Sequence, residues 1–570
     1  MNGDGPTGSN GHVNAGRQPL KFVSALPAPI LKPLGTVIGG SLSHGLEVRL
    51  DSNVDVEAMA VGRYATIEAN GQLFFGMITD VELRTTMPAL LDSPPGQDDD
   101  FLRDVYRGTA AYAVLHVTPM LRVSALENNP PEPVKTVPAH FSYVREATQG
   151  EVERIFGAED PQHFVIGTPL DMDVKVRLDY ERFVERSNGI FGKSGTGKTF
   201  LTRLVLLNVI QKSNAQRDAE HKAVHLVFDM HNEYGWEGTY EGPGGAVKGL
   251  KQLVPGSVSV FTLDEESSRN RKVKYDSAVT IGYNQIEAED IALLGETLNL
   301  SENSVEACHA LQARFREGWL DQALELFPDE NGPGSDLLKQ LSIHPATVTN
   351  LQRGLRKLIR NKPFLVPNAP ADSLKIMLST LLRGKSVVIE FGRFGNELDS
   401  YMLVANILTR RIYNEYRDLK EKAMGDRSQE PIRLMITIEE AHKFLDPRVA
   451  NQTIFGQIAR EMRKYNVTLL VIDQRPSMID TEVMSQLGTK VTCLLDNERD
   501  IDAVLAGVSG KSGLKDVLAR LETKQQTLIL GHAVPMPIVV RPEDYASTYD
   551  RWQQDLTGRP KAKISDLYPE

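Results

Sequence analysis

One octapeptide constrains the fold more than any other part of this 570-residue sequence. It follows the pattern G-x-x-x-x-G-K-[ST] and consists of Gly192, Lys193, Ser194, Gly195, Thr196, Gly197, Lys198 and Thr199. A short apolar stretch precedes it, and an apolar, helix-like stretch at 200–207 follows it. A glycine-rich turn between a strand and a helix lets backbone N–H groups surround an anion, and the helix N-terminus adds its dipole. The sequence therefore predicts a strand–loop–helix unit that binds phosphate groups.

All eight residues are candidates for binding a nucleotide, and ATP is the expected cofactor. Lys198 is expected to neutralise the β- and γ-phosphates, and Thr199 to ligate the Mg²⁺ ion that accompanies them. The alternative is a glycine-rich turn that matches the pattern by chance. The order of strand, loop and helix argues against that alternative.

From about residue 142 onward, short apolar runs alternate with longer helical stretches, which is typical of an α/β fold with a parallel sheet. The predicted strands of this sheet are 187–191, 224–228, 257–262, 386–391, 434–438, 468–472, 490–494 and 526–530. Residues 284–382 are mainly helical in pattern and interrupt these strands. The sequence thus predicts a RecA-like P-loop ATPase core with a helical insertion, and a last helical segment that begins near Arg541.

The preceding part of the chain has short β-like segments separated by glycine and asparagine turns, which predicts a small β-barrel. Its predicted strands are 34–38, 46–50, 62–67, 73–81, 111–117 and 134–138. The predicted organisation is a flexible N-terminus at 1–32, a barrel at 33–141, the first part of the core at 142–283, the helical insertion at 284–382, the second part of the core at 383–540, and a C-terminal extension at 541–570.

The net charge of −11 argues against a surface that binds nucleic acid all over, although a basic channel inside an acidic shell is compatible with it. The two cysteines, Cys308 and Cys493, exclude a disulfide framework and a cysteine-ligated zinc site. No apolar run reaches the length of about 20 residues that a membrane span needs, and the N-terminus lacks the apolar core of a signal peptide. We therefore expect a cytoplasmic protein without membrane partners.

Two acids, Glu439 and Glu440, directly follow the predicted strand 434–438. The carboxyl ends of strands are where α/β sheets place their ligands. Glu439 is expected to hold Mg²⁺, mostly through water, and Glu440 to act as the general base toward the attacking water. His442 is interpreted either as a link between the nucleotide and motion or as a local packing residue.

The next predicted strand, 468–472, leads to Gln474, whose amide can both donate to a phosphate and accept from the attacking water. Gln474 is therefore the candidate γ-phosphate sensor. A helical, basic segment before this strand contains Arg460 and Arg463. In an oligomeric ATPase, either arginine could complete the site of a neighbouring subunit, and the sequence does not choose between them. A solvated helix face is the alternative for both.

These motifs, in this order and together with the barrel, resemble the HerA hexameric DNA translocases of the HerA/FtsK group. The resemblance covers roughly residues 33–540. It is carried by 34–39, 61–65 and 75–81 in the barrel, the box Phe228-Asp229-Met230-His231-Asn232-Glu233-Tyr234, the acids at 438–444, the arginines at 460–465, and 474–476. The sequence departs from the family pattern at Asn232, Met462 and Asp473, which leaves the interface geometry open.

The resemblance implies a homo-hexameric ring around double-stranded DNA with ATP at subunit interfaces. It makes Glu440 the catalytic glutamate and Arg463 or Arg460 the arginine supplied by a neighbouring subunit. It also implies a partner such as a NurA-like nuclease or a sirtuin-like effector, in DNA end processing or antiviral defence. The basic run 269–274 and the loop 392–395 are candidate DNA contacts. Rival hypotheses are a peptide translocase, for which Phe394 would line the pore, and a ring that binds ATP only as a structural element.

Overall fold

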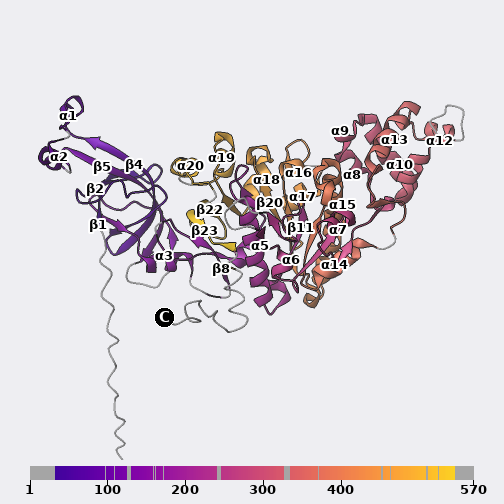
Figure 1. Cartoon of the computed structure of the whole chain (residues 1–570), viewed down its shortest axis with the longest axis horizontal. Helices are drawn as coiled ribbons and strands as arrows, with labels where there is room; N and C mark the ends of the chain where they lie inside the picture. The colour runs from indigo at the N-terminus through magenta and orange to yellow at the C-terminus, as the bar shows by residue number, and fades with distance from the viewer. Residues whose placement is uncertain are drawn as a thin grey trace, which may run out of the picture.

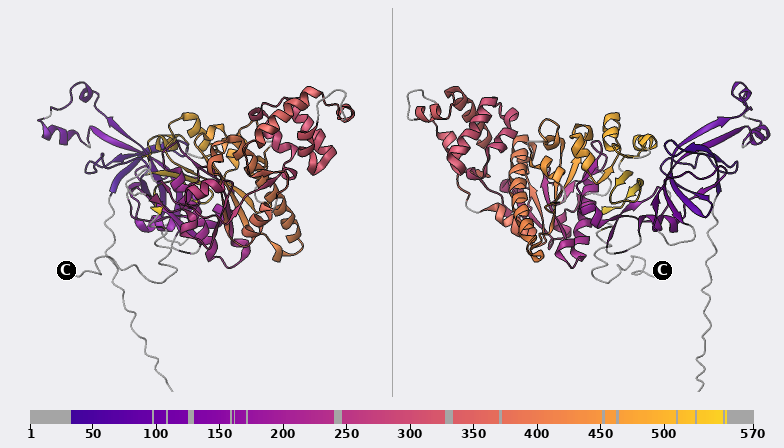
Figure 2. Two further views of the ribbon diagram at one scale, coloured as in Figure 1. Left: turned by 45° about the vertical axis from the view of Figure 1, so that its right-hand side comes forward. Right: turned by 180° about the vertical axis from the view of Figure 1, so that it is seen from behind.

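The structure of the chain is a computed structural model in which three parts follow one another along the longest axis (Figure 1). A β-barrel lies at one end, a large sheet with flanking helices lies in the middle, and a helical part lies at the other end (Figures 1 and 2). The structure describes residues 33–96, 98–107, 109–124, 130–157, 160, 162–170, 172–239, 246–326, 334–369, 372–450, 453–461, 464–508, 511–523, 526–545 and 548.

Six antiparallel strands close the barrel in the order β2-β1-β7-β3-β4-β5, because β2 also pairs with β5. The strands are β1 (Pro33–Ser41), β2 (Gly45–Leu50), β3 (Tyr64–Ala69), β4 (Gln72–Thr85), β5 (Ala111–Ser124) and β7 (Tyr143–Glu146), and the short β6 (Glu132–Pro133) extends the sheet beside β5. Closure pairs the two edges of the sheet with each other along Leu46–Arg49 and Val114–Val117. The interior is filled by apolar side chains such as Val48, Ile67 and Leu115, all fully buried.

The prediction of a sixth barrel strand at 134–138 is wrong, since that segment is not a strand. It lies between Pro133 and Pro138, and proline cannot donate to a strand ladder. The sixth strand is β7 instead, which inserts between β1 and β3 and buries Val144.

Strands β4 and β5 run beyond the barrel as a long hairpin and remain paired up to Thr85 and Ala111 (Figure 1). The residues between them, 86–110, are called the hairpin tip here. They include the helices α1 (Ala89–Asp92) and α2 (Asp100–Tyr106), neither of which has a buried residue. Leu91 is 74% exposed and Phe101 is 76% exposed, so the hairpin tip presents apolar side chains to its surroundings.

The central sheet has the strand order β15-β14-β18-β11-β19-β20-β10-β21-β22-β23-β8-β9 among the residues that the structure describes. Its strands are β8 (His163–Thr168), β9 (Val176–Asp179), β10 (Asn188–Phe191), β11 (Ala223–Asp229), β14 (Val258–Thr262), β15 (Ser277–Ala278), β18 (Ser386–Glu390), β19 (Arg433–Ile438), β20 (Val467–Asp473), β21 (Thr489–Thr492), β22 (Thr527–Gly531) and β23 (Ile538–Pro542). All eight predicted sheet strands are confirmed, with ends that differ by at most two residues.

The sheet is mixed, not wholly parallel as the pattern predicts. It is parallel from β15 to β21, whereas β22, β23, β8 and β9 pair antiparallel. The predicted last helical segment is present, but it begins at Tyr545 and not at Arg541, because Arg541 lies in β23 and pairs with Thr168. β-branched Ile538, Val539 and Val540 are fully buried there, which favours a strand.

Helices cover the sheet and form the end that is distant from the barrel (Figure 2). They are α3 (Gln149–Phe156), α4 (Tyr180–Val184), α5 (Lys198–Ala215), α6 (Leu250–Leu253), α7 (Glu265–Asn270), α8 (Ala288–Leu293), α9 (Gly295–Leu298), α10 (Glu302–Phe315), α11 (Trp319–Glu325), α12 (Ser335–Gln340), α13 (Pro345–Ile359), α14 (Ser373–Leu382), α15 (Leu398–Ala423), α16 (His442–Leu445), α17 (Ile454–Glu461), α18 (Thr481–Gln486), α19 (Glu498–Val504) and α20 (Lys511–Ala519). Two small strand pairs, β12 (Gly238–Thr239) with β13 (Ala246–Val247) and β16 (Ile281–Gly282) with β17 (Leu365–Val366), complete the fold. Within its described residues, the chain has no helix long and apolar enough to cross a membrane.

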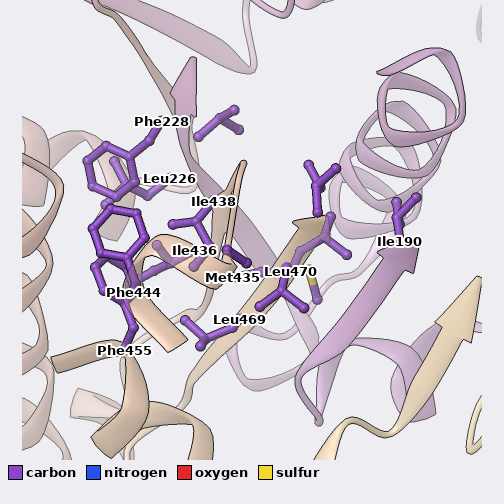
Figure 3. Close-up of a cluster of buried hydrophobic side chains, with 14 of the residues drawn as sticks. Ile190, Leu226, Phe228, Met435, Ile436, Ile438, Phe444, Phe455, Leu469 and Leu470 are labelled. Atoms are coloured by element: carbon purple, nitrogen blue, oxygen red, sulfur yellow. The ribbon is translucent and has the colours of Figure 1, made fainter. Parts of the chain in front are cut away.

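The apolar strands bury a continuous core beneath the ends of the sheet. Figure 3 shows part of it, with Ile190, Leu226, Phe228, Met435, Ile436, Ile438, Phe444, Phe455, Leu469 and Leu470 labelled. Tyr64 of the barrel joins this core, and its hydroxyl accepts a hydrogen bond of 3.0 Å from the Val539 N–H. Because β10, β11, β19 and β20 are parallel neighbours, their carboxyl ends meet at one edge and bring distant segments together.

One buried cation in this sheet makes stability depend on pH. Lys490 on β21 is 4% exposed, its ammonium donates to the Val504 carbonyl at 2.9 Å, and burial lowers its pKa to about 8. The unfolded chain, with an ordinary pKa of 10.5, binds more protons between these values, so the free energy of unfolding rises from pH 8 to pH 10.5.

We expect Lys490→Met to raise the free energy of unfolding at pH 7 by about 1–3 kcal/mol, because it removes a buried charge. The same change should flatten the stability increase between pH 8 and pH 10.5. Thermal melts of both proteins from pH 7 to pH 10 measure this difference. Parallel pH profiles for the two proteins would contradict the role assigned to Lys490.

Candidate active site

The glycine-rich octapeptide connects the end of β10 to the start of α5. Gly192 has φ +152°, and a Cβ there would lie 2.7 Å from the Cys493 Cβ, so a larger residue does not fit. Gly197 caps α5 with φ +93° and leaves the first N–H groups of the helix without a side-chain cap. The Thr196 hydroxyl donates to the Lys193 carbonyl at 2.8 Å, which fixes the loop. The loop is thus a preformed anion cradle at a helix N-terminus.

Lys198 is the first residue of α5, and burial lowers its pKa. Its ammonium donates to the Lys193 carbonyl at 3.0 Å, inside the loop. The ammonium of Lys193 itself turns outward and pairs with Asp496 at 3.0 Å. Of the two lysines, Lys198 is therefore the one placed to meet a bound phosphate.

A cavity of about 690 Å³ lies over this loop and collects side chains from seven segments. It is lined by Ser194, Gly195, Thr196, Gly197, Lys198, Thr199, Phe200, Leu201, Arg203, His231, Glu233, Glu439, Glu440, Ile472, Asp473, Gln474, Cys493, Gln526, Arg541, Pro542, Glu543 and Asp544. Six of the eight loop residues line it, whereas Gly192 and Lys193 do not. The cavity also unites both candidate acids with Gln474.

Glu439 comes directly after β19 and is 7% exposed. Its Oε1 accepts a 2.8 Å hydrogen bond from the Tyr234 hydroxyl, and its Oε2 is buried without a hydrogen-bond partner among the described residues. Burial, with the nearby carboxylate of Asp229, raises the pKa of Glu439 to about 8. A cation bound beside this carboxylate would stabilise its charged form.

Glu440 has φ +49°, a left-handed conformation that non-glycine residues rarely adopt. The turn directs its carboxylate to Gln474, whose Nε2 donates to Oε1 at 2.9 Å. The structure thereby brings together the two residues that the sequence assigns to water activation and phosphate sensing. Strain at a functional residue is a common feature of active sites.

Asp473, which departs from the family pattern, is an anchor for His442. Its Oδ2 accepts hydrogen bonds from the His442 backbone N–H at 2.7 Å and from Nδ1 at 2.9 Å. The same Nδ1 lies 3.6 Å from the Glu440 Oε2. His442 therefore lies between Asp473 and Glu440. This position is compatible both with a link between nucleotide and motion and with a local packing role.

The two candidate arginines differ in what the structure shows. Arg460 on α17 does not line the cavity, and its Nε donates to Glu482 at 3.1 Å. Arg463 lies outside the described residues. The assignment of an arginine to a neighbouring subunit stays a prediction for both.

Sequence reasoning missed several residues that line the cavity. Arg203 is one helical turn beyond Thr199 on α5, so helical periodicity could have identified it. Its guanidinium donates to the Glu233 carbonyl, which ties α5 to the box after β11. Gln526 and residues 541–544 carry no local signal, because they reach the cavity through the antiparallel pairings of β22 with β21 and of β23 with β22.

One arginine of each candidate DNA-contact segment is paired with acids in the single chain. Arg271 of the basic run donates to the buried Glu390 at 2.5 Å. Arg393 of the other loop pairs with Glu266 at 2.7 Å and with Asp264 at 3.2 Å. Phe394 is 2% exposed and packs on Phe364, so it does not present an aromatic side chain to solvent in this chain.

Comparisons with known proteins agree with this architecture. The model of the HAS barrel domain matches residues 34–120, and the model of the central domain of helicase HerA matches residues 164–412. The DNA double-strand break repair helicase HerA of Pyrococcus furiosus is 24% identical over 446 residues, which is 73% of this chain and 75% of that protein. The protein of the same name from Sulfurisphaera tokodaii is 24% identical over 516 residues, or 89% of this chain and 92% of that protein.

Among solved structures, VirB4 of Thermoanaerobacter pseudethanolicus is similar at 16% identity and a TM-score of 0.42, over 69% of this chain and 99% of that one. The match to the HAS barrel domain covers most of the barrel, and the match to the HerA central domain includes the phosphate-binding loop. With a HAS barrel followed by the HerA central domain, the chain belongs to the HerA helicase family of ATP-hydrolysing enzymes.

Proposed function

We propose that this protein is a Mg²⁺-dependent ATPase that moves double-stranded DNA through a homo-hexameric ring. The observation that carries the proposal is the single cavity in which the phosphate-binding loop, Glu439, Glu440 and Gln474 meet. The relatives are named DNA double-strand break repair helicases, which supports DNA as the substrate.

The residues present fit a hard cation. Thr199 and Glu439 both border the cavity with oxygen donors, the ligand type that Mg²⁺ prefers, and Glu439 Oε2 has no partner in the described chain. Mg²⁺, when bound, would neutralise charge on the phosphates. Thr199 and Glu439 are therefore the proposed residues that hold it.

The chemistry assigned to the protein side chains is general-base hydrolysis. Glu440 accepts the proton of the attacking water, and its hydrogen bond from Gln474 holds the carboxylate in place. Lys198 offsets the negative charge of the phosphates, and the N–H groups of the loop hold the oxygens. The Glu440–Gln474 pair favours turnover over a ring that binds ATP only as a structural element.

The rival hypothesis of a peptide translocase loses its main support. It required an exposed aromatic residue at the pore, and Phe394 is buried. Arg271 and Arg393 remain the proposed DNA contacts, because guanidinium groups that pair with carboxylates can exchange them for backbone phosphates.

We also propose that the hairpin tip docks a protein partner, such as a NurA-like nuclease or a sirtuin-like effector. The tip carries five aspartates and two arginines, so it repels DNA, and it exposes Leu91 and Phe101. Helices without a buried residue gain little from folding alone, which favours a partner with an apolar groove and a basic rim.

The net charge of −11 leads to a prediction about DNA binding. A single subunit should bind DNA weakly, whereas cations gathered in a ring channel neutralise several phosphates at once. We expect DNA binding to require the oligomer, to show little sequence preference, and to weaken steeply with salt. Double-stranded DNA should increase the rate of ATP hydrolysis.

Mass photometry, with ATPase rates measured at low and moderate salt with and without DNA, tests these expectations. A monomer with full DNA affinity would argue against the ring. An oligomer whose ATP hydrolysis does not respond to DNA, even with candidate partner proteins present, would favour a peptide as the cargo.

A further inference from the structure

Glu439 is held by two buried tyrosines from distant parts of the chain. The Tyr234 hydroxyl donates to Oε1 at 2.8 Å, across 205 positions of sequence. The Tyr401 hydroxyl accepts from the Glu439 N–H at 3.1 Å and donates to its carbonyl at 3.0 Å. Both tyrosines are 0% exposed, so water does not compete for these bonds. Tyr401 thereby fixes the main chain of Glu439, and Tyr234 fixes its carboxylate.

The two carboxylate oxygens of Glu439 are not equivalent. Oε1 is occupied by Tyr234, whereas Oε2 is buried and has no hydrogen-bond partner within the described chain. An unpaired buried acceptor is costly, so native proteins rarely retain one without a function. Because Glu439 borders the nucleotide cavity, a ligand in that cavity is the candidate partner for the free oxygen.

Asp229 explains how Tyr234 reaches this position. Its carboxylate, at the end of β11, accepts backbone hydrogen bonds from Glu233 at 2.7 Å, Tyr234 at 2.8 Å and Gly235 at 3.2 Å. These bonds fold residues 233–235 into a turn around a fully buried anchor. Since β11 and β19 are adjacent, the turn places Tyr234 against the residue that follows β19.

We propose that Tyr234 is a positioning residue that pins Glu439 Oε1 and so leaves Oε2 as the one oxygen that serves the hydrated Mg²⁺ ion. The residues of the box at 228–234 then have separate roles. Asp229 shapes the turn, Tyr234 orients the carboxylate, and His231 and Glu233 line the cavity. This inference rests on the proposed function, because it presumes a nucleotide bound with Mg²⁺.

The test compares Tyr234→Phe with Tyr416→Phe. Tyr416 on α15 is equally buried, but its hydroxyl has no hydrogen-bond partner in the described chain, so it is a matched control. Loss of a hydrogen bond that orients a metal ligand typically costs 10- to 100-fold in metal affinity or activity. We expect Tyr234→Phe to raise the Mg²⁺ concentration for half-maximal ATP hydrolysis about 10-fold or more, and Tyr416→Phe to leave it unchanged.

Calorimetric ADP affinity gives a second readout that does not depend on turnover. In excess Mg²⁺, Tyr234→Phe should bind ADP more weakly than the wild type, whereas in EDTA the two affinities should agree. Equal losses in both conditions would indicate a general distortion of the cavity and overturn the proposal. A Mg²⁺ requirement no different from that of Tyr416→Phe would overturn it as well.

A double variant tests whether the effect passes through Glu439. In a Glu439→Gln background, Tyr234→Phe should cause no further change in the Mg²⁺ dependence of ADP affinity, and a full additional loss would contradict the proposal. If the wild type hydrolyses no ATP with Mg²⁺, the proposed function fails. If it does and only the Tyr234 comparison is negative, the positioning role alone fails.

Discussion

Replacing Glu440 by glutamine is expected to abolish steady-state ATP hydrolysis while leaving ATP binding within a few-fold of wild type. The amide keeps the size of the side chain, but it cannot accept a proton from water. General-base catalysis contributes roughly 10²- to 10⁴-fold, so the loss should fall in or above that range. Lys198→Ala should also stop hydrolysis, and it should weaken ATP binding because the phosphates lose their cation.

Nucleotide affinity and single-turnover hydrolysis, measured for both variants, separate the two roles. Glu302→Gln, at an exposed position of α10, is the control for the change of glutamate to glutamine and should behave as wild type. Substantial hydrolysis by Glu440→Gln would show that another group activates the water. Equal nucleotide affinities for Glu440→Gln and Lys198→Ala would contradict the separation of roles.

The second large effect is expected from an arginine that a neighbouring subunit supplies. Arg463→Ala should leave assembly and ATP binding largely intact and reduce hydrolysis by roughly 10³-fold, the lower range for such arginines. Arg460→Ala should cost less, because the Arg460 guanidinium is already engaged by Glu482 and is near Asp480.

Mixed oligomers test whether the arginine acts between subunits. Combining Arg463→Ala subunits with Lys198→Ala subunits creates some interfaces that carry both an intact loop and an intact arginine. Activity should therefore partly return on mixing. If subunit exchange is verified by mass photometry and activity stays absent, Arg463 does not act across the interface.

Local sequence was sufficient wherever chemistry and fold are set by neighbours along the chain. The loop at 192–199 could be identified because its glycines, strand and helix are contiguous. The parallel strands could be identified because burial on both faces leaves almost wholly apolar runs, as in β19 and β20. Glu439, Glu440 and Gln474 follow such strands, so their meeting in one cavity could be inferred from sheet geometry.

What was missed depends on pairing between distant segments. The antiparallel strands β23, β8 and β9 have no sequence pattern that distinguishes them from other apolar segments. Arg541 and the residues after it, which line the cavity, were therefore missed as well. The contact between Tyr234 and Glu439 exists because two strands are adjacent, which no local pattern encodes. The barrel strand β7 is only four residues long, too short for periodicity to identify.

The hairpin tip has a consequence for how such a protein can diverge over evolutionary time. Among the described residues, it continues from the paired ends of β4 and β5, and its helices α1 and α2 have no buried residue. The exposed positions of the hairpin tip can therefore accept substitutions or insertions at little cost to folding or to the ATPase cavity. A homologous protein could thus acquire a new protein partner through changes in the hairpin tip alone, while its ATPase core remains unchanged.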